Sequence, residues 1–173
     1  MVRTVHELGG VLIVDEIYHG LTYGVPARSA LYYSADVFVV NSFSKYYGMT
    51  GWRVGWLVAP LGFVEAIERL AQNIFLAAST PAQHAALAAF RPEVLAELGR
   101  RRDEFRVRRD YLLPALRALG FHIPVTPEGA FYLYADSSRL AADSDDFAQR
   151  LLEEAGVAIT PGRDFGLHAP KRH

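Results

Sequence analysis

The sequence predicts an α/β fold, in which a mostly parallel sheet with helices is followed by a small domain of mixed α and β structure. Two short apolar runs rich in β-branched residues, 11–14 and 37–40, stop abruptly at polar residues, which is typical of strands in parallel sheets. After Pro60, apolar residues recur at helical spacing instead. We therefore expect a large domain over residues 1–88, including an inter-domain helix, and a small C-terminal domain over residues 89–173.

Three strands are expected in the large domain. The run at 11–14 ends at Asp15, and its uninterrupted apolar character predicts burial on both faces. The second strand covers residues 37–40 and is followed closely by Lys45, and the third covers residues 53–59. In open α/β sheets, ligands gather beyond the carboxyl ends of the strands. We therefore expect Asp15 and Lys45 to approach one crevice.

Helices are expected to follow. The first has apolar residues at helical spacing: Phe63, Ile67, Leu70 and Ile74. Ser79-Thr-Pro81 has the order of a helix start, a cap residue and then proline, with Gln83 expected on the surface. Pro92 opens a longer helix that Gly120 ends. Six arginines lie within residues 100–109, but interleaved Asp and Glu residues favour a solvated helix face over a nucleic-acid site.

The last third of the chain is expected to alternate strands and a helix. Two strands, 121–125 and 130–134, are expected on either side of the turn at 127–129. A helix at 145–155, ended by Gly156, and a short strand at 157–159 are expected to follow. These elements are expected to form a smaller unit of mixed α and β structure.

Composition excludes several classes of function. The chain has 173 residues, of which 51% are hydrophobic, and a net charge of −1, so neither a nucleic-acid nor an anionic-membrane partner is expected. It has no cysteine, which excludes disulfides and Cys-ligated metals and suits a reducing cytoplasm. No apolar run is long enough to cross a bilayer. We therefore expect a cytoplasmic protein without a metal site.

Lys45 is conspicuous because lysine is rare in this chain. Of its 18 basic residues only Lys45 and Lys171 are lysines. An ε-amine can lose its proton and form a Schiff base, whereas guanidinium stays protonated. The alternative is a surface lysine at a strand end, and scarcity alone does not decide between the two.

Three motifs follow one another in the order Asp15-Glu-Ile-Tyr18, Ser42-Phe-Ser-Lys45 and Gly48-x-x-Gly51-x-Arg53-x-Gly55. With these motifs, the chain closely resembles the fold-type I pyridoxal-phosphate enzymes, specifically the class I/II aminotransferases. The resemblance extends to Pro127-Glu-Gly-Ala-Phe-Tyr132 and Pro161-Gly-x-x-Phe-Gly166, which look like the C-terminal domain of that family.

The resemblance implies a role for five residues. Lys45 would hold pyridoxal 5′-phosphate as an internal aldimine and shuttle a proton during transamination between an amino acid and a 2-oxo acid. Asp15 would pair with the protonated pyridine nitrogen, and Tyr18 would donate a hydrogen bond to the ring's 3-oxygen. Ser42 and Arg53 would hold the phosphate, Arg53 through a forked contact that lysine could not copy.

The sequence departs from the family pattern at both ends. Family members begin with a long N-terminal portion that supplies much of the sheet, and here Asp15 arrives almost at the start. They also carry an arginine for the substrate carboxylate beyond Phe165-Gly166; Arg172 falls slightly short of that position, so we expect this arginine beyond residue 173. The resemblance thus implies the C-terminal half of an aminotransferase, which binds the cofactor partially and is inactive alone. Family members are homodimers.

Other interpretations remain open. Ser42-x-x-Lys45 also matches the signature of penicillin-binding proteins and class A β-lactamases, but their Ser-Asp-Asn and Lys-Thr-Gly motifs do not follow. The chain could instead be a non-catalytic remnant or association module of the same fold, or a pyridoxal-phosphate-dependent lyase. His19, next to Tyr18, is expected to be a polar loop residue and not part of the site.

Overall fold

The computed structural model describes residues 1–173 and contains two compact units. The first comprises residues 1–104 and 128–130, and the second comprises residues 105–127 and 131–173. Helix α4 contributes residues to both units. This division into compact units does not test the predicted domain boundary after residue 88, which stays a prediction.

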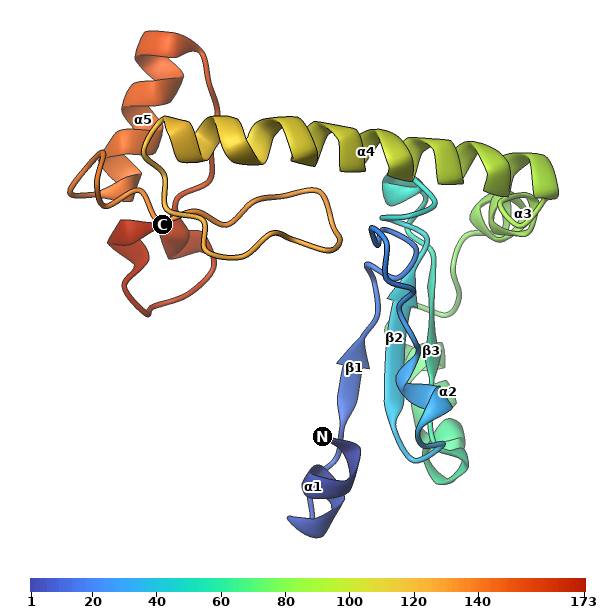
Figure 1. Ribbon diagram of the computed structural model, residues 1–173. Coiled ribbons are helices and arrows are strands. Elements are labelled where there is room, and N and C mark those ends of the chain that lie inside the picture. Colours follow the sequence, from blue (N-terminus) through green and yellow to red (C-terminus); the bar gives the residue numbers. More distant parts are fainter. The chain divides into compact units, whose positions relative to one another are not determined.

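The first unit is built on a three-stranded sheet in the order β1-β2-β3 (Figure 1). These strands are β1 (Ile13–Asp15), β2 (Phe38–Ser42) and β3 (Gly55–Val58). The β1–β2 pair is parallel and aligns Asp15 with Val40. The β2–β3 pair is antiparallel and aligns Ser42 with Gly55. All three expected strands are present, in a sheet that is mixed because the third strand reverses direction.

The prediction that the first strand is buried on both faces is wrong. Strand β1 lies at an edge of the sheet, and Ile13 is 66% exposed. Burial is confined to the central strand, where Val39 is 2% exposed. An uninterrupted apolar run therefore identified the strand correctly, but nothing in this chain packs over both of its faces.

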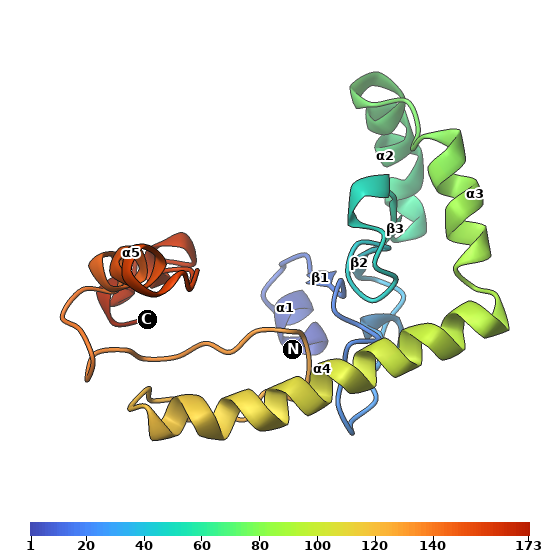
Figure 2. The same cartoon turned by 90° about the horizontal axis from the view of Figure 1, so that it is seen from above.

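Three helices accompany the sheet: α1 (Val2–Glu7), α2 (Leu61–Ile74) and α3 (Thr80–Ala88). In both views α2 lies beside β3, and its Phe63 ring meets the ring of Phe38 at the start of β2 with centroids 5.1 Å apart (Figure 1 and Figure 2). Ser79 occupies the N-cap position of α3, as expected, although its side chain makes no capping hydrogen bond. The buried cluster of this unit joins α3 to the loop after β2: Phe43, Met49, Ala86 and Ala89.

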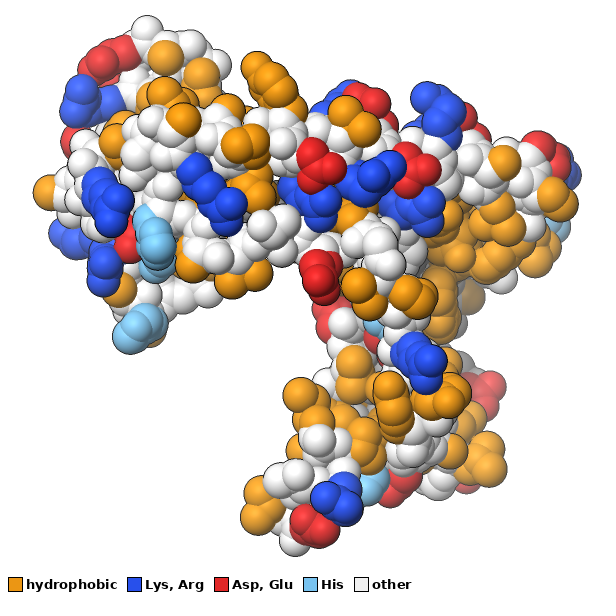
Figure 3. All heavy atoms as spheres, in the orientation of Figure 1, with side chains coloured by type: hydrophobic (Ala, Val, Ile, Leu, Met, Phe, Trp, Pro, Cys, Tyr) orange, Lys and Arg blue, Asp and Glu red, His pale blue; other side chains and the backbone are white.

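Helix α4 (Pro92–Ala118) carries the arginine-rich segment. Glu97 accepts hydrogen bonds from Arg100 at 2.7 Å and from Arg101 at 2.9 Å, while Arg102 pairs with Asp103. Basic and acidic side chains accordingly alternate along this helix (Figure 3). The expectation of a solvated, charge-balanced helix face is confirmed.

The second unit contains α5 (Ser144–Ala155), which ends at Gly156 in the left-handed conformation, as expected. The strands expected at 121–125, 130–134 and 157–159 are wrong. In their place the backbone of His122 pairs with that of Asp136 in one isolated antiparallel bridge. Pro124 has no N–H with which to extend a ladder from that bridge, and no neighbouring strand is present to continue it.

No helix of the structure is both long enough and apolar enough to span a membrane.

Candidate functional site

The polar residues expected to act together lie at one end of the three-stranded sheet. Asp15 is the last residue of β1 and Ser42 the last residue of β2. Arg53 precedes β3 by two residues, and because Ser42 pairs with Gly55, Arg53 lies beyond the same end. The parallel β1–β2 pair and the antiparallel β3 thus bring all three residues to one edge of the first unit.

The turn after β1 brings Tyr18 near Lys45. The Asp15 carboxylate accepts a hydrogen bond from the Ile17 N–H at 3.0 Å, which fixes the start of this turn. The Nζ atom of half-buried Lys45 lies 5.8 Å from the centre of the Tyr18 ring. This distance places the ammonium group over the aromatic face, within the range of a cation–π contact. Asp15 itself is exposed.

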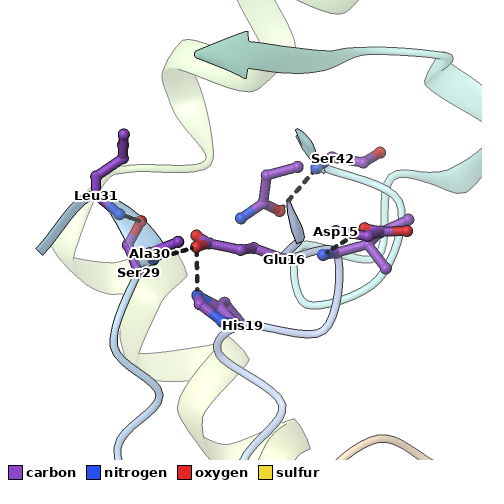
Figure 4. A network of polar contacts seen from close by, with 9 residues as sticks. Asp15, Glu16, His19, Ser29, Ala30, Leu31 and Ser42 are labelled. Carbon is purple, nitrogen blue, oxygen red and sulfur yellow. Dashed lines mark hydrogen bonds and ion pairs between the residues drawn. The ribbon is translucent and has the colours of Figure 1, made fainter. Parts of the chain in front are cut away.

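The buried carboxylate of Glu16 makes contacts that stabilise this turn. Glu16 is 4% exposed, and its Oε1 atom accepts a hydrogen bond from the Ala30 N–H at 2.7 Å (Figure 4). Its Oε2 atom lies 3.2 Å from Nδ1 of His19. His19 is a polar residue of this turn, as expected, and it is a partner of Glu16.

Hydroxyl groups organise the loop between β2 and Lys45. The Ser44 N–H donates to Oγ of Ser42 at 3.0 Å, and the two serine hydroxyls lie 2.9 Å apart. Thr50 donates from its hydroxyl to the Ser44 carbonyl at 2.7 Å. These bonds fold the segment from 42 to 50 back on itself, and the Ser42 hydroxyl also donates to the Val54 carbonyl at 3.3 Å, next to Arg53 in the chain.

Arg53 adopts a strained backbone conformation. Its φ and ψ angles of 53° and 52° are left-handed, which is uncommon for a residue with a side chain. A hydrogen bond from its Nη1 atom to the Thr50 carbonyl, at 3.1 Å, accompanies this conformation. Such strain persists where the surrounding structure requires it and is often found at functional sites.

The segment following Lys45 packs directly against the Tyr18 turn. Gly20 has a φ of +93°, and a Cβ atom placed on it would lie 2.6 Å from Cγ of Tyr46. The backbone at Gly20 therefore rests on the Tyr46 ring. Burial raises the pKa of the Tyr47 phenol, and the neighbouring Tyr46 adds to this effect.

A hollow of about 530 Å³ opens at this end of the sheet. Both polar and apolar groups line it, among them Ser42, Ser44, Arg53, Trp56, Leu70 and Ile74. Two hydroxyls and a guanidinium suit the oxygens of a phosphate group, because they provide charge-assisted and neutral hydrogen bonds together. These groups fit a phosphate such as that of pyridoxal 5′-phosphate, whereas Lys45, Asp15 and Tyr18 are not among the residues that line this hollow.

Two further residues make hydrogen bonds in this region and were missed by the sequence analysis: Glu16 and Ser44. Ser44 lies within the Ser42-Phe-Ser-Lys45 motif, where the alternation of two serines was a usable signal. Nothing in the sequence marked Glu16, because a carboxylate after a strand is usually solvated.

Gln83 and Arg172 lie outside this cluster of residues. Gln83 is exposed, as expected, and donates to the Ala78 carbonyl at 2.7 Å. Arg172 belongs to the second unit, where its Nη2 atom lies 3.0 Å from Oδ2 of Asp136. Hydrogen bonds from Ser138, with a smaller effect of the Arg172 charge, lower the pKa of Asp136.

Comparisons with known proteins agree over nearly the whole chain. Residues 1–172 match the family model for aminotransferase class I and II. The valine–pyruvate aminotransferase of Mycobacterium tuberculosis is 45% identical over 156 residues, which cover 89% of this chain and 40% of the relative. The (5-formylfuran-3-yl)methyl phosphate transaminase of Methanocaldococcus jannaschii is 39% identical over 158 residues, or 90% of this chain and 42% of the relative.

A crystal structure of an aminotransferase from Mycobacterium tuberculosis superposes with a TM-score of 0.90 and 42% identity, covering 96% of this chain and 44% of that one. The chain thus spans about two fifths of the length of the curated relatives it matches. The fold is accordingly α/β, and the chain belongs to the class I and II aminotransferases.

Proposed function

We propose that this chain carries the lysine and part of the cofactor site of an enzyme that transfers an amino group from an amino acid to a 2-oxo acid. The observation that supports this most directly is the placement of Lys45. It lies beside the Tyr18 ring, on a loop whose two serines line the same hollow as Arg53, with Asp15 at the neighbouring strand end. No other lysine occurs in this unit, because Lys171 belongs to the other.

Class I and II aminotransferases depend on pyridoxal 5′-phosphate. When bound, this cofactor supplies an aldehyde for attachment to the lysine amine and a pyridine ring that withdraws electrons from the substrate. Ser42 and Arg53 would hold the phosphate, and Arg53 is suited to this because its planar fork can give two parallel hydrogen bonds. Ser44 supports Ser42 through their hydroxyl contact.

The remaining residues would orient the ring and move a proton. The carboxylate of Asp15 would face the pyridine nitrogen and keep it protonated. The phenol of Tyr18 would donate a hydrogen bond to the ring oxygen. The Nζ atom of Lys45, as a free amine, would accept the proton of the substrate α-carbon and donate it again.

We also propose that the chain corresponds to the C-terminal part of the family fold. Residues 1–88 would then form part of the large domain, and residues 89–173 a small α+β domain. The arginine that binds the substrate carboxylate would lie beyond residue 173. Strands β1 and β3 are the outer strands of the sheet, and both carry exposed apolar residues. This incomplete burial supports the view that the chain alone does not turn over substrate.

We further propose an assembly and a location for the protein. A homodimer, as is typical of the family, would supply a second copy near the site. A cytoplasmic location agrees with the absence of cysteine. A non-catalytic association module, or a lyase using the same cofactor, would share Lys45, Asp15, Tyr18 and Arg53. Turnover assays with an amino acid and 2-oxoglutarate separate these functions.

The experiment that tests the proposal is cofactor attachment. The protein is mixed with pyridoxal phosphate, reduced with borohydride, and mapped for the modified lysine. We expect modification at Lys45 and loss of the adduct absorbance in Lys45→Ala. The matched control is Lys171→Ala, since Lys171 pairs with Asp143 at 2.8 Å in the other unit. An adduct that survives in Lys45→Ala and disappears in Lys171→Ala would refute the proposal.

A further inference from the structure

Glu16 is a buried carboxylate that none of the roles above uses. Both of its oxygens are engaged, Oε1 by the Ala30 N–H at 2.7 Å and Oε2 by the His19 ring at 3.2 Å. A buried carboxylate without such partners would be strongly unfavourable. The arrangement is therefore specific, and it connects residues 14 positions apart in the sequence.

The backbone of Glu16 is anchored as firmly as its side chain. Its N–H donates to the Val40 carbonyl at 2.8 Å, which adds one bond to the β1–β2 pairing beyond Asp15. Its carbonyl accepts from the His19 N–H, also at 2.8 Å. The turn from 16 to 19 is thus closed twice, once by backbone and once by the Glu16–His19 side-chain contact. Tyr18 lies inside this doubly closed turn.

The Ala30 contact holds the far end of the following loop. Ala30 begins the 3₁₀ turn Ala30–Tyr32, and the neighbouring Leu31 N–H is satisfied by Oγ of Ser29 at 3.2 Å (Figure 4). Between Glu16 and Ala30, the chain crosses the Tyr46 ring at Gly20. The Tyr18 turn is therefore held by Glu16 on one side and by the residue after Lys45 on the other.

We propose that Glu16 is a positioning residue, which sets the places of the Tyr18 phenol and the Asp15 carboxylate relative to the Lys45 amine. This inference rests on the proposed function. It assigns to Glu16 no contact with the cofactor. Glu16 follows β1 directly and is buried, whereas Asp15, the last residue of β1, is exposed, so the two neighbouring carboxylates have different surroundings.

The test compares Glu16→Gln with Val37→Ala in the full-length protein. Gln keeps the shape of Glu and can still accept from Ala30, but it removes the charge beside His19. Val37 is fully buried and precedes β2 at the end opposite Ser42, so shortening it lowers stability away from the site. Two quantities are measured: the rate at which pyridoxal phosphate attaches to Lys45, and the pH midpoint of the absorbance change of the lysine adduct.

We expect Glu16→Gln to slow attachment about tenfold and to move the pH midpoint by ~0.5 unit or more. Val37→Ala should leave both quantities unchanged. Wild-type values in Glu16→Gln would show that Glu16 only stabilises the fold, and the inference would be wrong. An equal shift in Val37→Ala would overturn it too. Adduct formation in Lys45→Ala would instead refute the proposed function, so the two failures are distinguishable.

Discussion

The contact between Gly20 and Tyr46 predicts a large effect of one methyl group. In Gly20→Ala the new Cβ would lie 2.6 Å from Cγ of Tyr46 and 2.8 Å from its Cδ1, closer than real side chains approach. Relieving such overpacking costs about 1–3 kcal/mol. The φ of +93° adds about 1–2 kcal/mol, because residues with a Cβ disfavour this region. We expect a total loss of stability of about 2–5 kcal/mol.

The chain offers a matched control for the backbone part of this loss. Gly24 has a similar φ of +87°, and a Cβ atom placed on it would meet nothing within 4 Å. Gly24→Ala should therefore lose only the conformational part, about 1–2 kcal/mol. The difference between the two variants isolates the contact with the Tyr46 ring.

Urea unfolding followed by circular dichroism measures both losses. Borohydride trapping of the Lys45 adduct, at a urea concentration where each variant is folded, measures whether the Tyr18 turn has moved. We expect Gly20→Ala to be less stable than Gly24→Ala by about 1–3 kcal/mol and to trap the cofactor more slowly. Equal stability of the two variants would refute the reasoning, because it would show that the ring moves aside freely.

Two further predictions concern Arg53 and Glu97. Arg53→Gly should raise stability by up to about 1 kcal/mol, because glycine adopts the left-handed conformation without strain. The same change should weaken pyridoxal phosphate binding at least ~10-fold through loss of the phosphate contact. Calorimetry measures the stability and cofactor titration the affinity, and an unchanged affinity would contradict the prediction. Hydrogen bonds from Arg100 and then Arg101 lower the pKa of Glu97 to about 2 from 4.5. The stabilising effect of the Glu97 carboxylate should therefore be complete above pH 4.5 and fade as the pH falls toward 2, so that the unfolding free energies of wild type and Glu97→Gln converge there. Because these groups are exposed, high salt should reduce the difference in unfolding free energy. A difference that grows in acid would be inconsistent with this pairing.

The sequence was sufficient to predict the elements whose signals are local. Helix α5 ends at Gly156 as expected, because a left-handed glycine is a local stop signal. Strand β2 and the polar residue that ends it, Ser42, were also predicted, since an apolar β-branched run followed by polar residues marks a strand and its end. These features depend on neighbours within a few positions.

Features that depend on distant partners were not predictable in the same way. The segment 121–125 has the composition of a strand, but pairing requires a neighbour, and only the His122–Asp136 bridge forms. The burial of Glu16 depends on Ala30, which the chain reaches only after the loop crosses Tyr46. Tertiary context therefore decided both outcomes.

The two edge strands of the three-stranded sheet have a consequence for the chain during its synthesis. Strands β1 and β3 present unpaired backbone amides and carbonyls along both borders, next to exposed side chains such as Ile13 and Leu57. Exposed edge strands pair with strands of other chains and cause aggregation, and aggregation is most frequent before folding is complete. We expect this segment to bind holding chaperones during synthesis until its borders are capped.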